Sequence, residues 1–175
     1  MPSAAKTNIF LAIITIIAIS TTSAHASNSL CKDEDEVYFS CSTKSKKLIS
    51  LCKSTSQPDS TEIISYKFGT KRRVELEFST TQEQLKDRFS RNHYFRYLTE
   101  YLRVNFTNNN YQYSLFKDYD QSIDKAPRFG VIVSNLSDPS VEHEISCASV
   151  TVDKLQEFAK PLPCNPDSAL GCAAL

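Results

Sequence analysis

The sequence lacks several features that would place it in a large functional class. Lys and Arg together number 20, as do Asp and Glu, so the chain has no basic excess and we expect no nucleic-acid partner. No Gly-x-Ser-x-Gly segment occurs, which argues against the hydrolases that carry this motif. No Cys-x-x-Cys pair occurs, and no histidine after residue 26 has ligand spacing to a cysteine. The sequence therefore predicts neither a metal site nor a cofactor.

The N-terminus has the pattern of a cleavable signal peptide. Lys6 supplies a positive charge, residues 9–19 are apolar, and Ala24-His25-Ala26 ends a polar stretch with the small residues that signal peptidases accept. We expect cleavage after Ala26, which leaves one exported domain of 149 residues, 27–175. Without Lys6 the exported chain holds 19 basic and 20 acidic residues, a formal net charge of −1.

Two membrane-bound alternatives fit the N-terminus less well. A membrane anchor needs roughly 20 apolar residues, and the run at 9–19 is about half that length. A lipid-modified cysteine normally follows a small residue, whereas Cys31 follows Leu30. The sequence thus predicts a secreted or periplasmic protein without a stable membrane anchor once the signal peptide is removed.

The six cysteines all follow the predicted cleavage site. They are Cys31, Cys41, Cys52, Cys147, Cys164 and Cys172. An even number of cysteines in an exported chain predicts disulfides, because an oxidising compartment preserves them. We expect a local bridge between the last two, and a bridge from Cys147 to one of the first three.

Period-two alternation of apolar and polar residues predicts a mainly β domain. Val74, Leu76 and Phe78, for example, alternate with charged residues, which is typical of a sheet with one face in water. Four hairpins are expected. They cover residues 37–52, 62–78, 101–115 and 129–147. Eight or so short strands predict a disulfide-stabilised antiparallel sandwich or barrel.

One or two short helices are expected beside the strands. Thr81 followed by Gln84 resembles a capping box, which predicts a helix over residues 82–91. Residues 93–100 fit a helix or a strand. A second helix is predicted over 151–160, because Pro161 would end it.

The richest basic and aromatic stretch of the chain lies between Lys86 and Arg103. Tyr and Arg are favoured anchors of protein interfaces, so this stretch predicts a partner-binding surface. The alternative is that its aromatic residues belong to the core and its charges to the wet face of the same element. The predicted partner-binding residues are Arg88, Arg91, His93, Tyr94, Arg96 and Tyr97.

The sequence contains no catalytic set that can be assigned. His143 and His93 are the candidate bases of a secreted hydrolase, and either would need a nearby carboxylate. His143 alternates with Val141 and Ile145, which favours a histidine at the edge of the core. The acidic loop at 118–129 has Ile123 and Phe129 where an EF-hand needs Gly and Glu, so a solvated loop is the better interpretation.

The chain resembles a family of small exported proteobacterial proteins of unassigned function. The resemblance rests on Cys41 and Cys52 with the segments Leu48-Ile49-Ser50-Leu51, Tyr66-Lys67-Phe68-Gly69, Gly130-Val131-Ile132-Val133 and a strand ending in Cys147. It implies a periplasmic setting and supplies no active site. More loosely, the chain is similar in kind to periplasmic lysozyme inhibitors, although it lacks the Ser-Gly dipeptide of their inhibitory loops. These features together predict a binding or inhibitor module with a protein partner, and a secreted hydrolase is the alternative.

Overall fold

A computed structural model describes residues 28–175, so the signal peptide expected over 1–26 and its cleavage site lie outside the described residues. Nine strands and two short helices follow one another along the chain. They are β1 (Glu36–Thr43), β2 (Leu48–Thr55), β3 (Glu62–Thr70), β4 (Arg73–Thr81), α1 (Leu85–Arg88), β5 (Phe89–Arg96), β6 (Thr99–Asn108), β7 (Tyr111–Asp120), β8 (Arg128–Asn135), β9 (Asp138–Asp153) and α2 (Leu155–Ala159). Across residues 28–175, no helix combines the length and the apolar character needed to cross a membrane.

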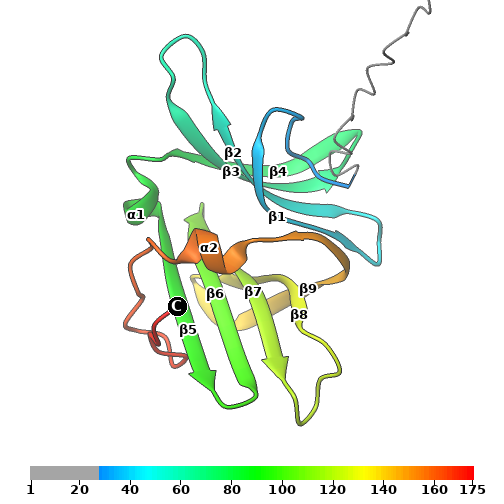
Figure 1. Ribbon diagram of the computed structural model, residues 1–175, viewed down its shortest axis with the longest axis vertical. Helices are drawn as coiled ribbons and strands as arrows, with labels where there is room; N and C mark the ends of the chain where they lie inside the picture. Colours follow the sequence, from blue (N-terminus) through cyan, green and yellow to red (C-terminus); the bar gives the residue numbers. More distant parts are fainter. Residues whose placement is uncertain (1–27) are drawn as a thin grey trace, which may run out of the picture.

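The strands form one antiparallel sheet in the order β4-β3-β2-β1-β9-β8-β7-β6-β5. The sheet curls into a half-barrel whose two edge strands are β4 and β5 (Figure 1). The 16-residue β9 joins the two halves, because its first part pairs with β8 and its last part pairs with β1. The predicted mainly β, antiparallel class is confirmed, with nine strands in place of about eight.

All four predicted hairpins are present, as β1–β2, β3–β4, β6–β7 and β8–β9. The additional strand is β5, which lies partly where a helix over 82–91 was predicted. The Thr81 hydroxyl does accept the backbone N–H of Gln84 at 3.3 Å, as in a capped helix. The helix nevertheless ends at Arg88, because Phe89 is extended (φ −122°, ψ 146°) and begins an eight-residue pairing with β6. The ambiguous residues 93–100 therefore form a strand, a turn and the start of the next strand.

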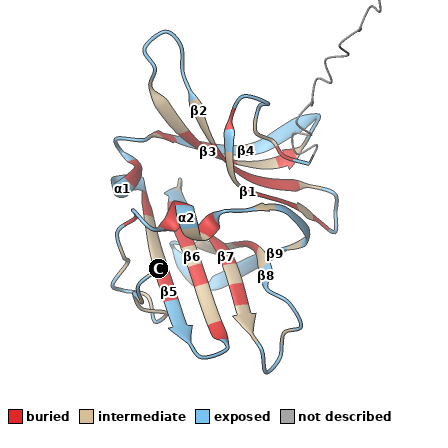
Figure 2. Ribbon diagram, in the orientation of Figure 1, coloured by how far each residue is buried: buried red, intermediate tan, exposed pale blue. Residues whose placement is uncertain are grey.

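The second predicted helix is present but shorter than expected. It covers Leu155–Ala159, because residues 151–153 still belong to β9, where Val152 and Asp153 pair with β1. Its buried Phe158 contacts the rings of Phe89 (centroids 5.5 Å apart) and Tyr38 (5.1 Å). The helix thus covers the concave face of the sheet, and the buried residues of both halves meet beneath it (Figure 2).

Three disulfides connect the cysteines, and the described chain contains no free thiol. Cys31 pairs with Cys52, Cys41 with Cys147, and Cys164 with Cys172. Both expected bridges are therefore confirmed, with Cys41 as the partner of Cys147. Disulfides of this number are typical of a chain that folds in an oxidising environment.

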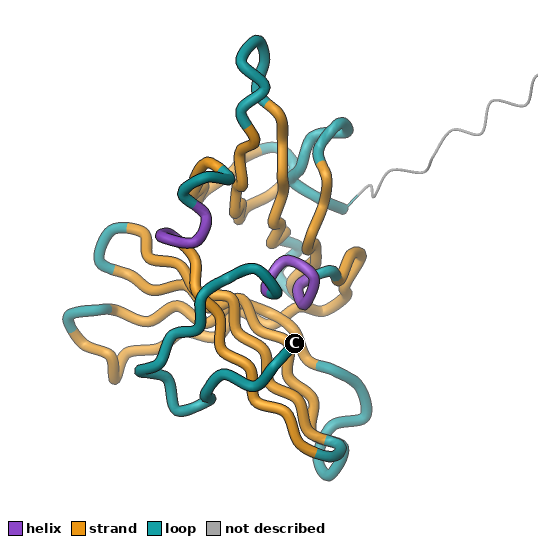
Figure 3. Tube along the Cα trace, turned by 60° about the vertical axis from the view of Figure 1, so that its left-hand side comes forward, coloured by secondary structure: helices purple, strands orange, loops and turns teal. Residues whose placement is uncertain are grey.

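The C-terminal tail covers part of the open edge at β5. Backbone N–H groups of Arg91 and His93 donate to the carbonyls of Pro163 (2.8 Å) and Gly171 (3.2 Å), and Ala173 returns a hydrogen bond to His93 (2.8 Å). The Cys164–Cys172 bridge closes this part of the tail, which runs beside the sheet to the C-terminus (Figure 3). An unpaired edge strand invites pairing with other chains, so the tail blocks that route along the middle of β5.

Candidate functional site

The most conspicuous surface feature is the turn between β5 and β6. Side chains there are exposed although they are large and apolar: Tyr97 is 86 % exposed, Phe95 65 % and Leu98 45 %. With Tyr94, this five-residue segment holds four of the ten exposed large hydrophobic residues of the described chain. Large exposed apolar groups that cluster mark interaction sites more often than groups that are scattered singly. We call residues 94–98 the aromatic turn.

The hairpin geometry explains why these side chains reach solvent. Arg96 pairs with Thr99, so Tyr97 and Leu98 alone connect the two strands and lie beyond the last pair of the ladder. Phe95 is one residue from the end of β5, past the stretch that the C-terminal tail covers. The tip of β5 is accordingly exposed while the middle of the strand is buried (Figure 2).

The backbone of the turn is strained at Leu98. Its φ is +61°, in the left-handed region that Gly and Asn adopt readily and that a residue with a bulky side chain adopts only at a cost. The Leu98 carbonyl accepts the backbone N–H of Gln121 at 3.0 Å, which ties the turn to the loop after β7. Strained residues of this kind concentrate at functional sites, so this conformation is a reason to assign function to the turn.

Aromatic stacking further restricts the side chains of this region. Tyr94 and Tyr101 face each other across the two strands, with ring centroids 5.9 Å apart and an interplanar angle of 22°. Phe95 stacks in the same way on His93, at 6.2 Å and 24°. Rings held in place before binding lose little rotational freedom when a partner is bound. The backbone of the aromatic turn and the rings of Tyr94 and Phe95 are therefore preorganised.

A hollow of about 470 Å³ adjoins the turn, and Asp120 is one of the residues that line it. Asp120 accepts hydrogen bonds from the hydroxyl (2.6 Å) and the backbone N–H (3.0 Å) of Ser122, and these bonds lower the pKa of its carboxyl. Partial burial and the nearby Asp120 raise the pKa of the Tyr101 hydroxyl. Arg96 lies 3.8 Å from Asp120, but its side chain is 62 % exposed, so this ion pair holds it weakly. Arg96 remains available to a carboxylate of a partner.

The structure places the six predicted partner-binding residues in two different settings. Tyr94, Arg96 and Tyr97 lie together at the aromatic turn. His93 is buried, at 3 % exposure, and Arg91 donates a hydrogen bond to the carbonyl of Ala173 (3.2 Å). Arg88 ends α1 and lies over the ring of Phe78, 5.1 Å from its centroid. The predicted stretch thus has an exposed tip, a middle at Arg91 and His93 that the tail covers, and an exposed Arg88 at the opposite end of β5.

The sequence interpretation missed Phe95 and Leu98 as members of the site. Phe95 lies within the basic and aromatic stretch Lys86 to Arg103 but is not among the residues predicted to bind a partner. Leu98 gave one signal that could have been used: two strand patterns meet at Tyr97-Leu98, where a tight turn normally requires Gly or Asn.

Neither candidate catalytic histidine has the surroundings of a general base. The Nδ1 atom of His93 lies 2.9 Å from the Ala174 carbonyl oxygen and Nε2 lies 3.1 Å from a Glu100 carboxylate oxygen, so both ring nitrogens are engaged inside the fold. The expectation that His143 lies at the edge of the core is wrong: it is exposed on β9, and no hydrogen bond joins it to a carboxylate among residues 28–175. The same residues contain no cluster of His, Cys, Asp and Glu that could hold a metal ion.

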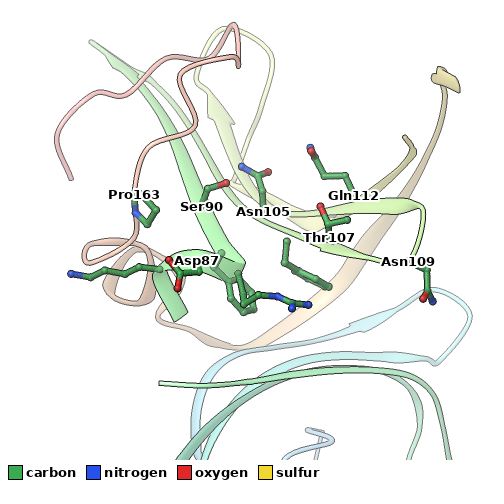
Figure 4. A pocket seen from close by; sticks show the side chains of 11 residues that line it. Asp87, Ser90, Asn105, Thr107, Asn109, Gln112 and Pro163 are labelled. Atoms are coloured by element: carbon green, nitrogen blue, oxygen red, sulfur yellow. The ribbon is translucent and has the colours of Figure 1, made fainter. Parts of the chain in front are cut away.

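A second hollow, of about 490 Å³, lies between α1 and strands β5 to β7. Ser90, Asn105 and Gln112 project into it from three neighbouring strands (Figure 4). Lys86 and Arg88 of α1 contribute positive charge at its rim. The lining includes no histidine or cysteine, so Ser90 has no base beside it here to make it a nucleophile.

Comparisons with known proteins assign no family to this chain: no family model, no curated protein and no solved structure matches it.

Proposed function

We propose that the chain is an exported, disulfide-stapled binding or inhibitor module that acts on a protein partner in the periplasm. The contact is made by the aromatic turn, with Tyr97, Phe95 and Leu98 as the apolar anchors. Arg96 supplies the charge at its rim. The observation that carries this proposal is the row of exposed apolar side chains on a strained, two-residue turn.

The turn supports a binding role because its residues are energetically unfavourable in the free protein. Exposure of three large apolar groups and a left-handed leucine both oppose folding and solubility. A turn with Gly or Asn in place of Leu98 would connect the same strands without either cost. Retention of the unfavourable residues is explained if a partner buries them, because buried aromatic and Arg anchors contribute most of the affinity of protein interfaces.

The shape of the turn indicates the kind of partner. A hairpin tip is convex, so its partner must offer a concave apolar cleft, and enzyme active sites are the commonest such clefts. A rigid loop that enters an active-site cleft inhibits the enzyme. The three disulfides and the predicted signal peptide fit a module that works outside the cytoplasm, where an oxidising environment preserves the bridges.

A capture experiment with matched tyrosine variants tests the proposal. The chain from residue 27 is immobilised with its disulfides intact and exposed to periplasmic extract, and the captured protein is then purified for affinity measurements. Tyr97→Ser removes an anchor of about 2 kcal/mol or more and should weaken binding at least about 30-fold. Tyr111→Ser is the control, because Tyr111 is also exposed (43 %) but lies at the other end of the β6–β7 pair.

Three variants are compared, Tyr97→Ser, Phe95→Ser and Tyr111→Ser, and thermal unfolding checks that each keeps its fold. Loss of binding in Tyr97→Ser and in Phe95→Ser, with binding retained in Tyr111→Ser, supports the proposed contact. Equal binding by all three variants, or loss only in Tyr111→Ser, would remove the aromatic turn from the interface.

A further inference from the structure

Two neighbouring turns at one end of the sheet carry a concentrated positive charge. The β1–β2 turn contributes Lys44, Lys46 and Lys47, and the β3–β4 turn contributes Lys71, Arg72 and Arg73. Leu48 at the start of β2 pairs with Gly69 at the end of β3, so the two turns lie side by side. We call these six residues the basic end. It lies in the half of the sheet that does not contain the aromatic turn.

The positive charge of the basic end is not neutralised within the described chain. Lys47 pairs with Glu75 at 2.7 Å, whereas no ion pair is formed by the other five cations with any residue from 28 to 175. All five are exposed. Six cations and one carboxylate give the basic end a charge of +5, and since the whole chain has a formal net charge of zero, the rest of it carries −5. A near-neutral composition therefore hides a strongly polar distribution of charge.

The backbone holds these cations in place. At Gly69 (φ +149°) an added Cβ would lie 2.4 Å from the Arg73 carbonyl oxygen, so only glycine permits the close approach at the base of the β3–β4 turn. In the other turn, Thr43 and Lys47 pair through their backbones at 2.8 Å, and the Lys46 N–H donates to the Thr43 carbonyl at 2.9 Å. The two turns border a hollow of about 530 Å³ lined by Lys46, Lys71 and Arg72 together with hydroxyl groups of Thr43 and Thr70.

The chain enters the fold at this same end. Asn28, the first residue that the structure describes, lines the hollow between the turns. The apolar run at residues 9–19 precedes it by nine residues, which reach about 30 Å at full extension. Until the predicted signal peptide is cleaved, an apolar leader in the membrane therefore keeps the basic end within about 30 Å of the lipid headgroups.

We propose that the basic end binds the anionic phosphate headgroups of a lipid membrane. Lys and Arg are the residues that bind phosphate, and exposed clusters of them are attracted to anionic leaflets. The lining of the hollow between the turns contains no aromatic side chain on which a nucleic-acid base could stack. Binding at the basic end holds the exported domain at the membrane surface and leaves the aromatic turn, in the other half of the sheet, open to a partner.

Flotation with lipid vesicles tests this site independently of the partner. The chain from residue 27, which contains the whole described fold, should float with vesicles that contain phosphatidylglycerol and not with vesicles of phosphatidylcholine alone. Each Lys or Arg near an anionic leaflet contributes about fivefold to partitioning, so Lys71→Gln with Arg72→Gln should reduce binding about 25-fold. Lys125→Gln with Lys160→Gln is the matched control, because it removes the same charge from exposed residues elsewhere and should retain most of the binding.

Several results would overturn the proposal. Wild-type chain that does not float with anionic vesicles refutes it, and so does an equal loss in the two double variants. Stronger binding to duplex DNA than to the vesicles would assign the basic end to nucleic acid instead. Displacement by inorganic phosphate, at an ionic strength where chloride does not displace the chain, would indicate a discrete phosphate site rather than a membrane surface. None of these outcomes depends on the aromatic turn.

Discussion

Leu98 permits a test in which the usual effect of glycine should be reversed. At an ordinary position, replacement by Gly leaves a protein about 0.5–1 kcal/mol less stable than replacement by Ala, because Gly loses more conformational freedom on folding. At a left-handed position, a residue with a Cβ costs about 1–2 kcal/mol that Gly does not. The φ of +61° therefore predicts that Leu98→Gly is more stable than Leu98→Ala by about 0.5–1 kcal/mol.

Comparison of these two variants separates the backbone from the side chain. Both remove nearly the same apolar contacts of Leu98, which is 45 % exposed, so their difference reports the backbone: the strain that Gly relieves less the conformational freedom that Gly loses. Urea-induced unfolding with the disulfides intact measures this difference in free energy. In thermal unfolding, each kcal/mol should raise the melting temperature by about 2–4 °C for a domain of this size. Tyr97 is the neighbouring control. Its φ is not positive, so Tyr97→Ala should be more stable than Tyr97→Gly.

In Leu98→Gly, we expect the affinity for the partner to fall although strain in the fold is relieved. The variant should bind the captured partner more weakly than wild type, because an apolar anchor and the rigidity of the turn are both lost. If Leu98→Ala proves more stable than Leu98→Gly, as at Tyr97, the turn stores no strain and that reason for a functional assignment disappears.

Three further predictions concern the scaffold. Replacement of both Cys41 and Cys147 by Ala should cost about 4–5 kcal/mol in denaturant unfolding, because this bridge spans 106 residues of chain; a loss below about 1 kcal/mol would contradict the chain-entropy argument. Arg103→Met should lower the free energy of unfolding by about 3 kcal/mol, because it leaves the buried carboxylate of Asp118 without its bidentate guanidinium partner. A loss no greater than that of a surface ion pair would contradict this. Burial raises the pKa of Tyr66, so the folded chain keeps a proton that the unfolded chain releases near pH 10. The free energy of unfolding should therefore be unaffected by this group below pH 10 and fall by about 1.4 kcal/mol per pH unit above it. In Tyr66→Phe the fall should be less steep.

The sequence carried most of the information about the fold because strand alternation is a local signal. The β3–β4 hairpin was predicted from Val74, Leu76 and Phe78 and is present as expected. The first part of β5 was wrongly predicted as a helix, because Thr81 and Gln84 resemble a capping box, and residues 93–100 fitted a helix or a strand; pairing with β6 decides for the strand. Long-range pairing overrides such a short local pattern.

The candidate site was predictable in composition but not in placement. Local enrichment in Arg and Tyr pointed to residues 88–97, and that segment contains the exposed turn except for Leu98. Burial of His93 depends on contacts with Ala174, 81 residues further along the chain, which no local pattern reports. The basic end was hidden for the same reason: its two turns are ordinary polar turns in sequence, and only the β2–β3 pairing places them together.

Site-specific cross-linking tests the central proposal most directly. A photoreactive benzophenone side chain replaces Tyr97 in one variant and Tyr111 in another, and each is irradiated in periplasmic extract. If the aromatic turn is the contact surface, position 97 should cross-link to one protein and position 111 to none. Cross-links to the same protein from position 111, with none from position 97, would contradict the account.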